Sequence, residues 1–194
     1  MVAYDPAIEW VRAQNSLWSE LSGSHIARWV GTDFTVGDGD ELVFLDRSSP
    51  FRQLEAVRLE REDGPSFDLG IYQNDDTFGL SIKHSDAGPL LPSHWARVAD
   101  LSDLPVGRID RLEVHLDNRD GAEGDLIEVQ LAIDNRMVLI AAAEVEASRE
   151  LPMLAWGDES LFVFTNPATA DELTWKTPRL YTVRDVRDGV NVFP

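Results

Sequence analysis

Apolar residues recur with a helical spacing near the start of the chain. They form one stripe along a helix and consist of Ile8, Val11, Trp18 and Leu21. Asp5 and Pro6 precede the stripe, and a capping carboxylate followed by a proline is typical of a helix start. Gly23 follows the stripe, as glycine often does where a helix ends. The pattern predicts one amphipathic helix over residues 6–21 that packs on a sheet.

Strand-like patterns replace the helical spacing from Phe34 onward. A short apolar run, bounded by turn-forming residues, occupies residues 41–45. Three further segments are bounded by turn signals and cover residues 54–60, 67–73 and 78–82. Because alternating segments joined by short turns pair with their neighbours, we predict a three-stranded antiparallel meander here.

A second meander is predicted in the middle of the chain, with strands over residues 109–116, 126–133 and 137–145. The turn between its last two strands falls at Asp134-Asn135-Arg136. A strand at residues 160–164 comes next. The remaining pattern predicts a short helix over residues 167–174, capped by Asn166 or Thr165, and a last strand near residues 179–183.

These elements together predict an α+β fold that consists mainly of antiparallel β meanders. The two meanders, over residues 34–84 and 108–165, would form one curved sheet or a barrel-like sandwich. The length predicts a single domain over residues 1–194. Residues 85–107 are interrupted by Pro and Gly and contain one short apolar segment over residues 94–101, so we predict a long connection with one helical turn. A loop or lobe boundary would fall there.

The charge changes this picture more than any motif does. Thirty-five Asp and Glu oppose seventeen Lys and Arg, which gives a formal net charge of −18. The excess of acids is greatest within residues 100–172. Such a field attracts cations and basic surfaces and repels phosphates. The composition therefore predicts a basic protein partner and argues against direct binding to nucleic acid.

Other features of the sequence exclude several classes of protein. The chain has no cysteine, which excludes disulfides, thiolate zinc sites and cysteine nucleophiles. The apolar run over residues 137–143 is too short to span a bilayer, and the N-terminus has no secretory leader. We therefore expect a cytoplasmic protein that does not contact a membrane.

Acidic side chains at predicted turns are the first candidate site. We predict that they lie exposed and close together as a partner-binding surface, with Trp156 as an aromatic anchor. The surface consists of Asp117, Asp120, Glu123, Asp125, Trp156, Asp158 and Glu159. The same turns are rich in oxygen ligands, but their glycines are misplaced for a helix–loop–helix calcium site. No metal site and no cofactor are predicted.

The histidines and one tryptophan are the second candidate site. A pocket between the sheet and the connection over residues 85–107 would be lined by His84, His94, Trp95 and His115. None of the histidine pairs has the helical spacing of a zinc protease, and Ser93-His94 lacks the glycines of a nucleophile elbow. No catalytic residues are therefore predicted.

Three hypotheses of function follow. The first is a non-enzymatic acidic binding protein, such as an immunity protein that covers the basic surface of a nuclease-type toxin. The second is a small-ligand-binding protein or an enzyme that uses the predicted pocket. The third is a homodimeric structural module whose sheet edge pairs with a second copy. The immunity-protein hypothesis rests only on general properties that the chain shares with that class of protein, since no motif in the chain identifies a family.

Overall fold

The computed structural model describes residues 6–34, 49–74, 77–86, 88–94, 96–117, 124–146, 153–176 and 178–186. Within these ranges the chain forms two helices, α1 (Pro6–Leu21) and α2 (Pro167–Glu172). The eleven strands in the same ranges are β1 (His25–Phe34), β2 (Phe51–Arg61), β3 (Phe67–Asn74), β4 (Thr77–His84), β5 (Ala96–Ala99), β6 (Gly107–Asp117), β7 (Leu126–Ile133), β8 (Arg136–Glu146), β9 (Met153–Trp156), β10 (Ser160–Phe164) and β11 (Tyr181–Asp185).

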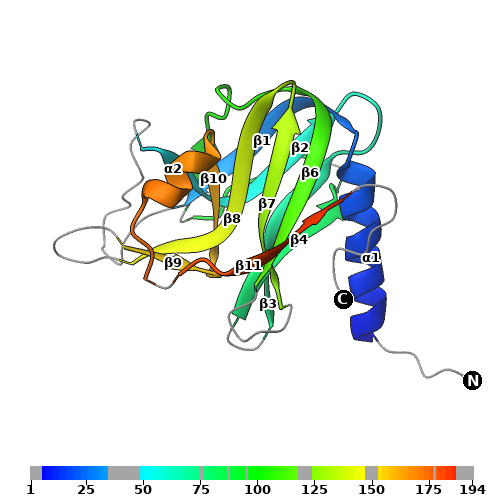
Figure 1. The fold of residues 1–194 in the computed structure, drawn as a ribbon. Helices are drawn as coiled ribbons and strands as arrows, with labels where there is room; N and C mark the ends of the chain where they lie inside the picture. Colours follow the sequence, from blue (N-terminus) through cyan, green and yellow to red (C-terminus); the bar gives the residue numbers. More distant parts are fainter. Residues whose placement is uncertain are drawn as a thin grey trace, which may run out of the picture.

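Six strands close into a ring, which gives the sheet its curved shape (Figure 1). The antiparallel pairings run from β1 to β2, β10, β8, β7 and β6, and the first two residues of β6 return to the start of β1. Because an open antiparallel sheet leaves unpaired edges, closure satisfies backbone groups that would otherwise face solvent. The ring thus follows from backbone hydrogen bonding as much as from the core.

The other five strands extend the ring. The hairpin of β3 and β4 continues from β2, and β5 pairs with β1. β9 pairs with the end of β8, and β11 pairs with β6. In Figure 1, β11 crosses the front of the sheet on its way to β6. Arg179, two residues before β11, bonds Glu128 of β7, so this part of the chain lies against the sheet.

The inner face of the sheet holds the larger core. Alternate residues of the ring strands point inward, and α1 adds Trp18 and Leu21, both fully buried. The helix packs beside β4, where the Gln14 side chain bonds the backbone N–H and C=O of Ile82, both at 2.9 Å. Burial of the Trp18 side chain and the two hydrogen bonds of the Gln14 amide together fix the position of the helix.

The outer face of β8 and β10 carries a second, smaller core. It contains stacked aromatic rings, with the centroids of Phe51 and Phe162 4.6 Å apart, and α2 covers it. Asn166 caps α2 through Ala168 N–H, and Pro167 takes the first turn. Residues on both faces of β8 and β10 are therefore buried, which explains their nearly continuous apolar sequences.

The structure confirms the predicted fold class and most of its elements. The N-terminal helix, both meanders and the helix that begins at Pro167 are present. Asp134 and Asn135 form the predicted turn and have positive φ values of 45° and 64°, as a tight two-residue hairpin requires. Of the predicted stripe, Trp18 and Leu21 are fully buried and Val11 is partly buried. The side chain of Ile8 lies outside the described residues.

Two predictions are corrected or left aside. The helical turn predicted in the connection over residues 85–107 is wrong for the described part of it, which contains no helix and in which residues 96–99 form β5 and pair with β1. The sheet supplies hydrogen-bond partners there that local sequence cannot reveal. The strand predicted at residues 41–45 lies outside the described residues. The pattern did not indicate β1 over its full length, nor the short β9.

Candidate functional site

The acidic side chains predicted at turns lie at one end of the sheet. β6 ends at Asp117, β7 begins just after Asp125, and β10 begins just after Glu159. Because these strands and β8 alternate in direction, the end of β6 and the starts of β7 and β10 meet at the same end of the sheet. We call Asp117, Asp125, Asp158 and Glu159 the acidic end. Asp120 and Glu123 lie outside the described residues.

The backbone holds Asp117 and Asp125 together. The Asp117 N–H donates to the Asp125 carbonyl, and the Gly124 N–H donates to the Asp117 carbonyl, both at 2.8 Å. Asp125 also accepts a 2.6 Å hydrogen bond from the Tyr72 hydroxyl of β3. Burial of Tyr72, with the hydrogen bond to Asp125, raises the pKa of its hydroxyl. This tyrosine therefore acts as a neutral hydrogen-bond donor to Asp125.

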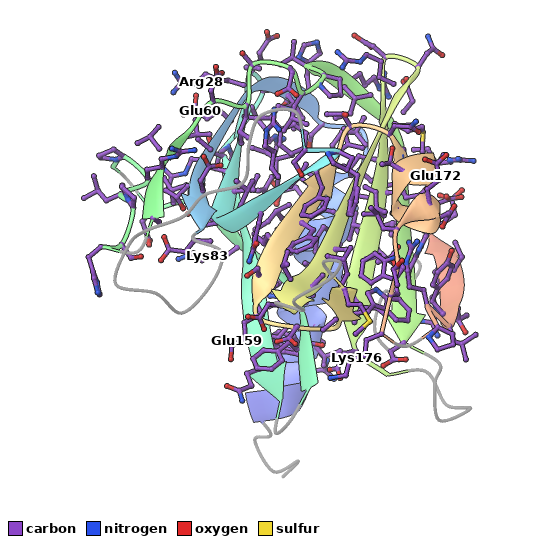
Figure 2. All side chains as sticks on the ribbon, turned by 90° about the vertical axis from the view of Figure 1, so that its left-hand side faces the viewer. Arg28, Glu60, Lys83, Glu159, Glu172 and Lys176 are labelled. Carbon is purple, nitrogen blue, oxygen red and sulfur yellow. The ribbon has the colours of Figure 1, made fainter. Side chains whose placement is uncertain are left out.

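Asp158 and Glu159 occupy the turn between β9 and β10. Asp158 Oδ1 accepts from the Glu159 backbone N–H at 2.8 Å, which shapes the turn and leaves the Glu159 side chain exposed. Figure 2 shows Glu159 at the lower end of the sheet, far from the Arg28–Glu60 ion pair at its upper end. The acidic end thus combines a hairpin base with a neighbouring turn.

His115 belongs to a buried ion cluster on the outer face of the ring. Its Nδ1 lies 3.2 Å from Oε2 of Glu128, which faces it on β7 and is fully buried. Arg179 binds the same carboxylate with a two-pronged contact, from Nε to Oε1 and from Nη2 to Oε2, both at 2.7 Å. Its Nη1 donates to Asp171 of α2 at 2.8 Å. We call these four residues the Glu128 cluster.

The electrostatics of this cluster favour a charged Glu128. Burial alone would raise the pKa of Glu128, but hydrogen bonds from His115 and Arg179 and their charges lower it, and the net direction is downward. Burial opposes the charge of Arg179, yet its hydrogen bonds and charge contact with Glu128 raise its pKa. The two side chains therefore form an ion pair that stays charged at neutral pH.

Aromatic rings enclose the ion cluster. The Tyr181 ring stacks on His115 with centroids 4.4 Å apart and meets Trp156 edge-on at 5.9 Å. The guanidinium carbon of Arg179 lies 5.2 Å from the ring centre of Trp175. Trp156 is 3% exposed, so it is a core residue here rather than a surface anchor. The structure thus brings two residues from the two predicted sites, His115 and Trp156, into contact with the aromatic ring of Tyr181.

Sequence reasoning missed Glu128 and Arg179, the centre of this cluster. One signal was present, because Glu128 is a charged residue between Ile127 and Val129 in a strand buried on both faces. A charge in such a run needs a partner nearby. No pattern could have shown that this partner comes from Arg179, fifty-one residues further along the chain.

The other residues of the predicted pocket lie apart from His115. His84 is exposed on β4, and its Nε2 lies 3.0 Å from Glu20 of α1. His94 is exposed in the connection before β5, and Trp95 lies outside the described residues. An open groove of about 310 Å³ does lie between β1 and residues 98–106. None of the described histidines lines it, and its walls include Trp29, Val98 and Val106.

Three further findings bear on the site. The described residues contain no group of three or more His, Asp or Glu side chains placed to hold a metal ion. Neither helix in the described ranges is long and apolar enough to cross a membrane. Comparison with protein families, with curated proteins and with solved structures finds no match for this chain.

Proposed function

We propose that this chain is a non-enzymatic binding protein that docks a basic protein partner on its acidic end. The observation that carries the proposal is the distribution of ion pairs. Most Lys and Arg side chains in the described ranges are already bound to carboxylates, namely Arg28, Arg52, Arg58, Arg61, Lys83, Arg97, Arg111 and Arg179. The acids that remain give the surface its negative field.

The acidic end is the best-placed part of that surface. No ion pair within the described ranges involves Asp158 or Glu159. A carboxylate that has no internal cation can pair with a cation of another protein without first breaking a contact. Charges of opposite sign also steer the two proteins together and raise the association rate at low salt. An immunity-type inhibitor of a basic nuclease would use such a surface.

Removal of charge from the acidic end tests this proposal. The double variant Asp158→Asn with Glu159→Gln keeps the shape of the turn, because the Asn oxygen can still accept from residue 159. The matched control, Asp110→Asn with Asp134→Asn, removes two exposed acids from the other end of the β6–β8 strands. Surface plasmon resonance with an immobilised polyarginine peptide would measure the association rate of each.

We expect the Asp158→Asn/Glu159→Gln variant to associate with the polyarginine peptide more slowly than the control variant does at low ionic strength. At about 1 M salt, where the Debye length is about 3 Å, the difference should vanish. Equal rates for the two variants at low salt would show that the charge acts as a diffuse field without a docking surface, and would contradict the proposal.

The groove beside residues 98–106 supports a second candidate function. It lies between the sheet and the connection over residues 85–107, where a small-ligand pocket was predicted, and Val98 and Val106 are exposed at 67% and 51%. An apolar ligand would cover these two side chains. Quenching of Trp29 fluorescence by a hydrophobic dye, lost in Val98→Asp, would favour this function over the first.

A further inference from the structure

A separate depression of about 340 Å³ opens on the outer face beside α2. Its lining consists of Asp171, Trp175, Pro178, Arg179 and Tyr181, and it shares no residue with the acidic end. Ligand pockets commonly measure roughly 300–1,000 Å³, so this one would accept a molecule of about one ring. Neither of the two sequence-based candidate sites includes any of these residues.

The floor of the depression is rigid and oriented. The fully buried Glu128 accepts hydrogen bonds from Nε and Nη2 of Arg179, and Asp171 accepts one from Nη1. These contacts use three of the five N–H groups of the guanidinium. One N–H on each terminal nitrogen is therefore left to donate to an oxygen of a bound molecule, and the donor does not have to be reorganised on binding.

The walls supply the two other kinds of contact. The side chain of Asp171 is 75% exposed, so its carboxylate can accept hydrogen bonds from a ligand while it holds Arg179. Trp175 and Tyr181 are partly exposed and flank the guanidinium, at 5.2 and 5.9 Å from its central carbon. The site therefore offers donors, an acceptor and aromatic surface within one depression.

The charges of the site discriminate among ligand classes. The carboxylates of Glu128 and Asp171 both contact Arg179 and offset its charge, so phosphate or another anion would gain little net attraction there. A cation would find Asp171 and the rings, but the fixed charge of Arg179 would repel it. A neutral ring that carries hydroxyl groups can use every feature, because it donates to Asp171, accepts from Arg179 and lays its C–H face on the aromatic rings.

We propose that this depression is a binding site for a neutral sugar ring. Saturation-transfer NMR with glucose, galactose, mannose and N-acetylglucosamine, each offered separately to the full chain, tests it directly. At least one of these sugars should bind, and its C–H protons should receive the strongest transfer from the aromatic rings. A shift in tryptophan emission on titration should give the same affinity.

Variants of the exposed Asp171 separate the site from the stability of the fold. Asp171→Ala should weaken binding about tenfold or more, because it removes a charged acceptor, and Asp171→Asn should weaken it less. Glu172→Gln, which removes the next acid on α2, should bind like the wild type. Arg179 is left unchanged in these tests, since its loss would leave Glu128 buried without a charge partner.

Three results would overturn the proposal. The first is that none of the four sugars binds. The second is that the sugar that binds does so equally well to Asp171→Ala, which would place it elsewhere. The third is stronger binding of inorganic phosphate or of lysine methyl ester than of any sugar, which would show that charge and not hydroxyl geometry governs the site.

Discussion

Two buried arginine–carboxylate pairs hold different regions of this molecule, and their surroundings differ. Arg58 on β2 binds Asp68 on β3 through two contacts of 2.6 and 3.0 Å, and both side chains are 10% exposed. Arg179 binds Glu128 through two contacts of 2.7 Å, and the Glu128 side chain is not exposed at all. The fork geometry is the same and the two arginines are about equally exposed, at 10% and 9%, but of the two carboxylates only Glu128 is sealed from water.

The partners of each pair show what it holds in place. Arg58 also donates to the Gly88 carbonyl at 2.5 Å, and Asp68 accepts from Ser85, so this pair ties the start of the connection after β4 to the sheet. Glu128 is held by His115 and Arg179, so the second pair ties α2 and β11 to the outer face. The first pair can exchange its contacts for water if it opens, whereas Glu128 cannot.

The largest effect is expected for Arg179→Ala. Removal of one member of a buried ion pair commonly costs about 3–5 kcal/mol, because the other charge stays buried without a partner. Glu128 would retain only His115 in the described contacts. Urea unfolding should therefore show a loss in this range, with β11 and the ring of Tyr181 losing their fixed position in NMR spectra.

A double variant sharpens that result. Glu128→Leu with Arg179→Leu removes both charges and fills the space with apolar atoms, so it should recover most of the lost stability. If Arg179→Ala cost less than about 1 kcal/mol, water would have to reach Glu128 in the variant. The contrast between a sealed carboxylate at Glu128 and an accessible one at Asp68 would then be wrong.

Asp68→Asn should cost less, about 1–3 kcal/mol, because Arg58 keeps the Gly88 carbonyl and the side chain is within reach of water. Its effect should also be local. Hydrogen exchange should speed up at Ser85, whose backbone N–H bonds to Ser66, while amides of β7 and β8 stay protected. Equal loss of protection in β7 would mean that the region around Arg58 and Asp68 unfolds together with β7 and β8.

Acid unfolding should distinguish the two pairs by pH. Burial alone would raise the pKa values of Glu128 and Asp68, but both are lowered. Hydrogen bonds from His115 and Arg179 act on Glu128, hydrogen bonds from Arg58 and Ser85 act on Asp68, and nearby charges add to the effect in each case. A lowered pKa means that stability is present above the ordinary pKa and is lost as pH falls through the folded one. These ordinary values are 4.5 for Glu128 and 3.8 for Asp68, so the loss from Glu128 should begin at higher pH.

Stability measured from pH 6 downward checks this order. Each group contributes a slope of up to about 1.4 kcal/mol per pH unit. Glu128→Gln should remove the part of the decline that begins first, and Asp68→Asn should remove the later part. Identical pH profiles for the wild type and Glu128→Gln would show that folding does not change the pKa of this carboxylate, and would contradict the prediction.

The same two pairs show what sequence patterns can and cannot predict. Residue spacing found α1, the hairpins and the cap at Asn166, because these depend on neighbours along the chain. Asp68 and Arg58 also lie close in sequence, on adjacent strands of a predicted meander. The contact between Glu128 and Arg179 depends on how the chain folds back over the outer face, and alternation says nothing about that. The same limitation hid β5, which takes its hydrogen bonds from β1.

The smallest effect is expected from salt, and it tests the surface against these buried pairs. The net charge of −18 disfavours the compact state, and at about 0.15 M salt the Debye length of about 8 Å screens exposed charges far more than buried ones. The melting temperature should therefore rise by roughly 2–4 °C between low salt and this concentration, as for about 1 kcal/mol in a chain of this size.

Mild acidification from pH 7 should act in the same direction, because it lowers the net charge before Glu128 and Asp68 become protonated. The stability maximum should thus lie below pH 7, but above the pH at which protonation of Glu128 and Asp68 begins to break their ion pairs with Arg179 and Arg58. Calorimetry across salt and pH measures both trends. A melting temperature that falls with added salt would show that exposed ion pairs such as Arg28–Glu60 outweigh the repulsion. The acid excess would then be neutralised locally, and the field that is proposed to draw a basic partner to the acidic end would be absent.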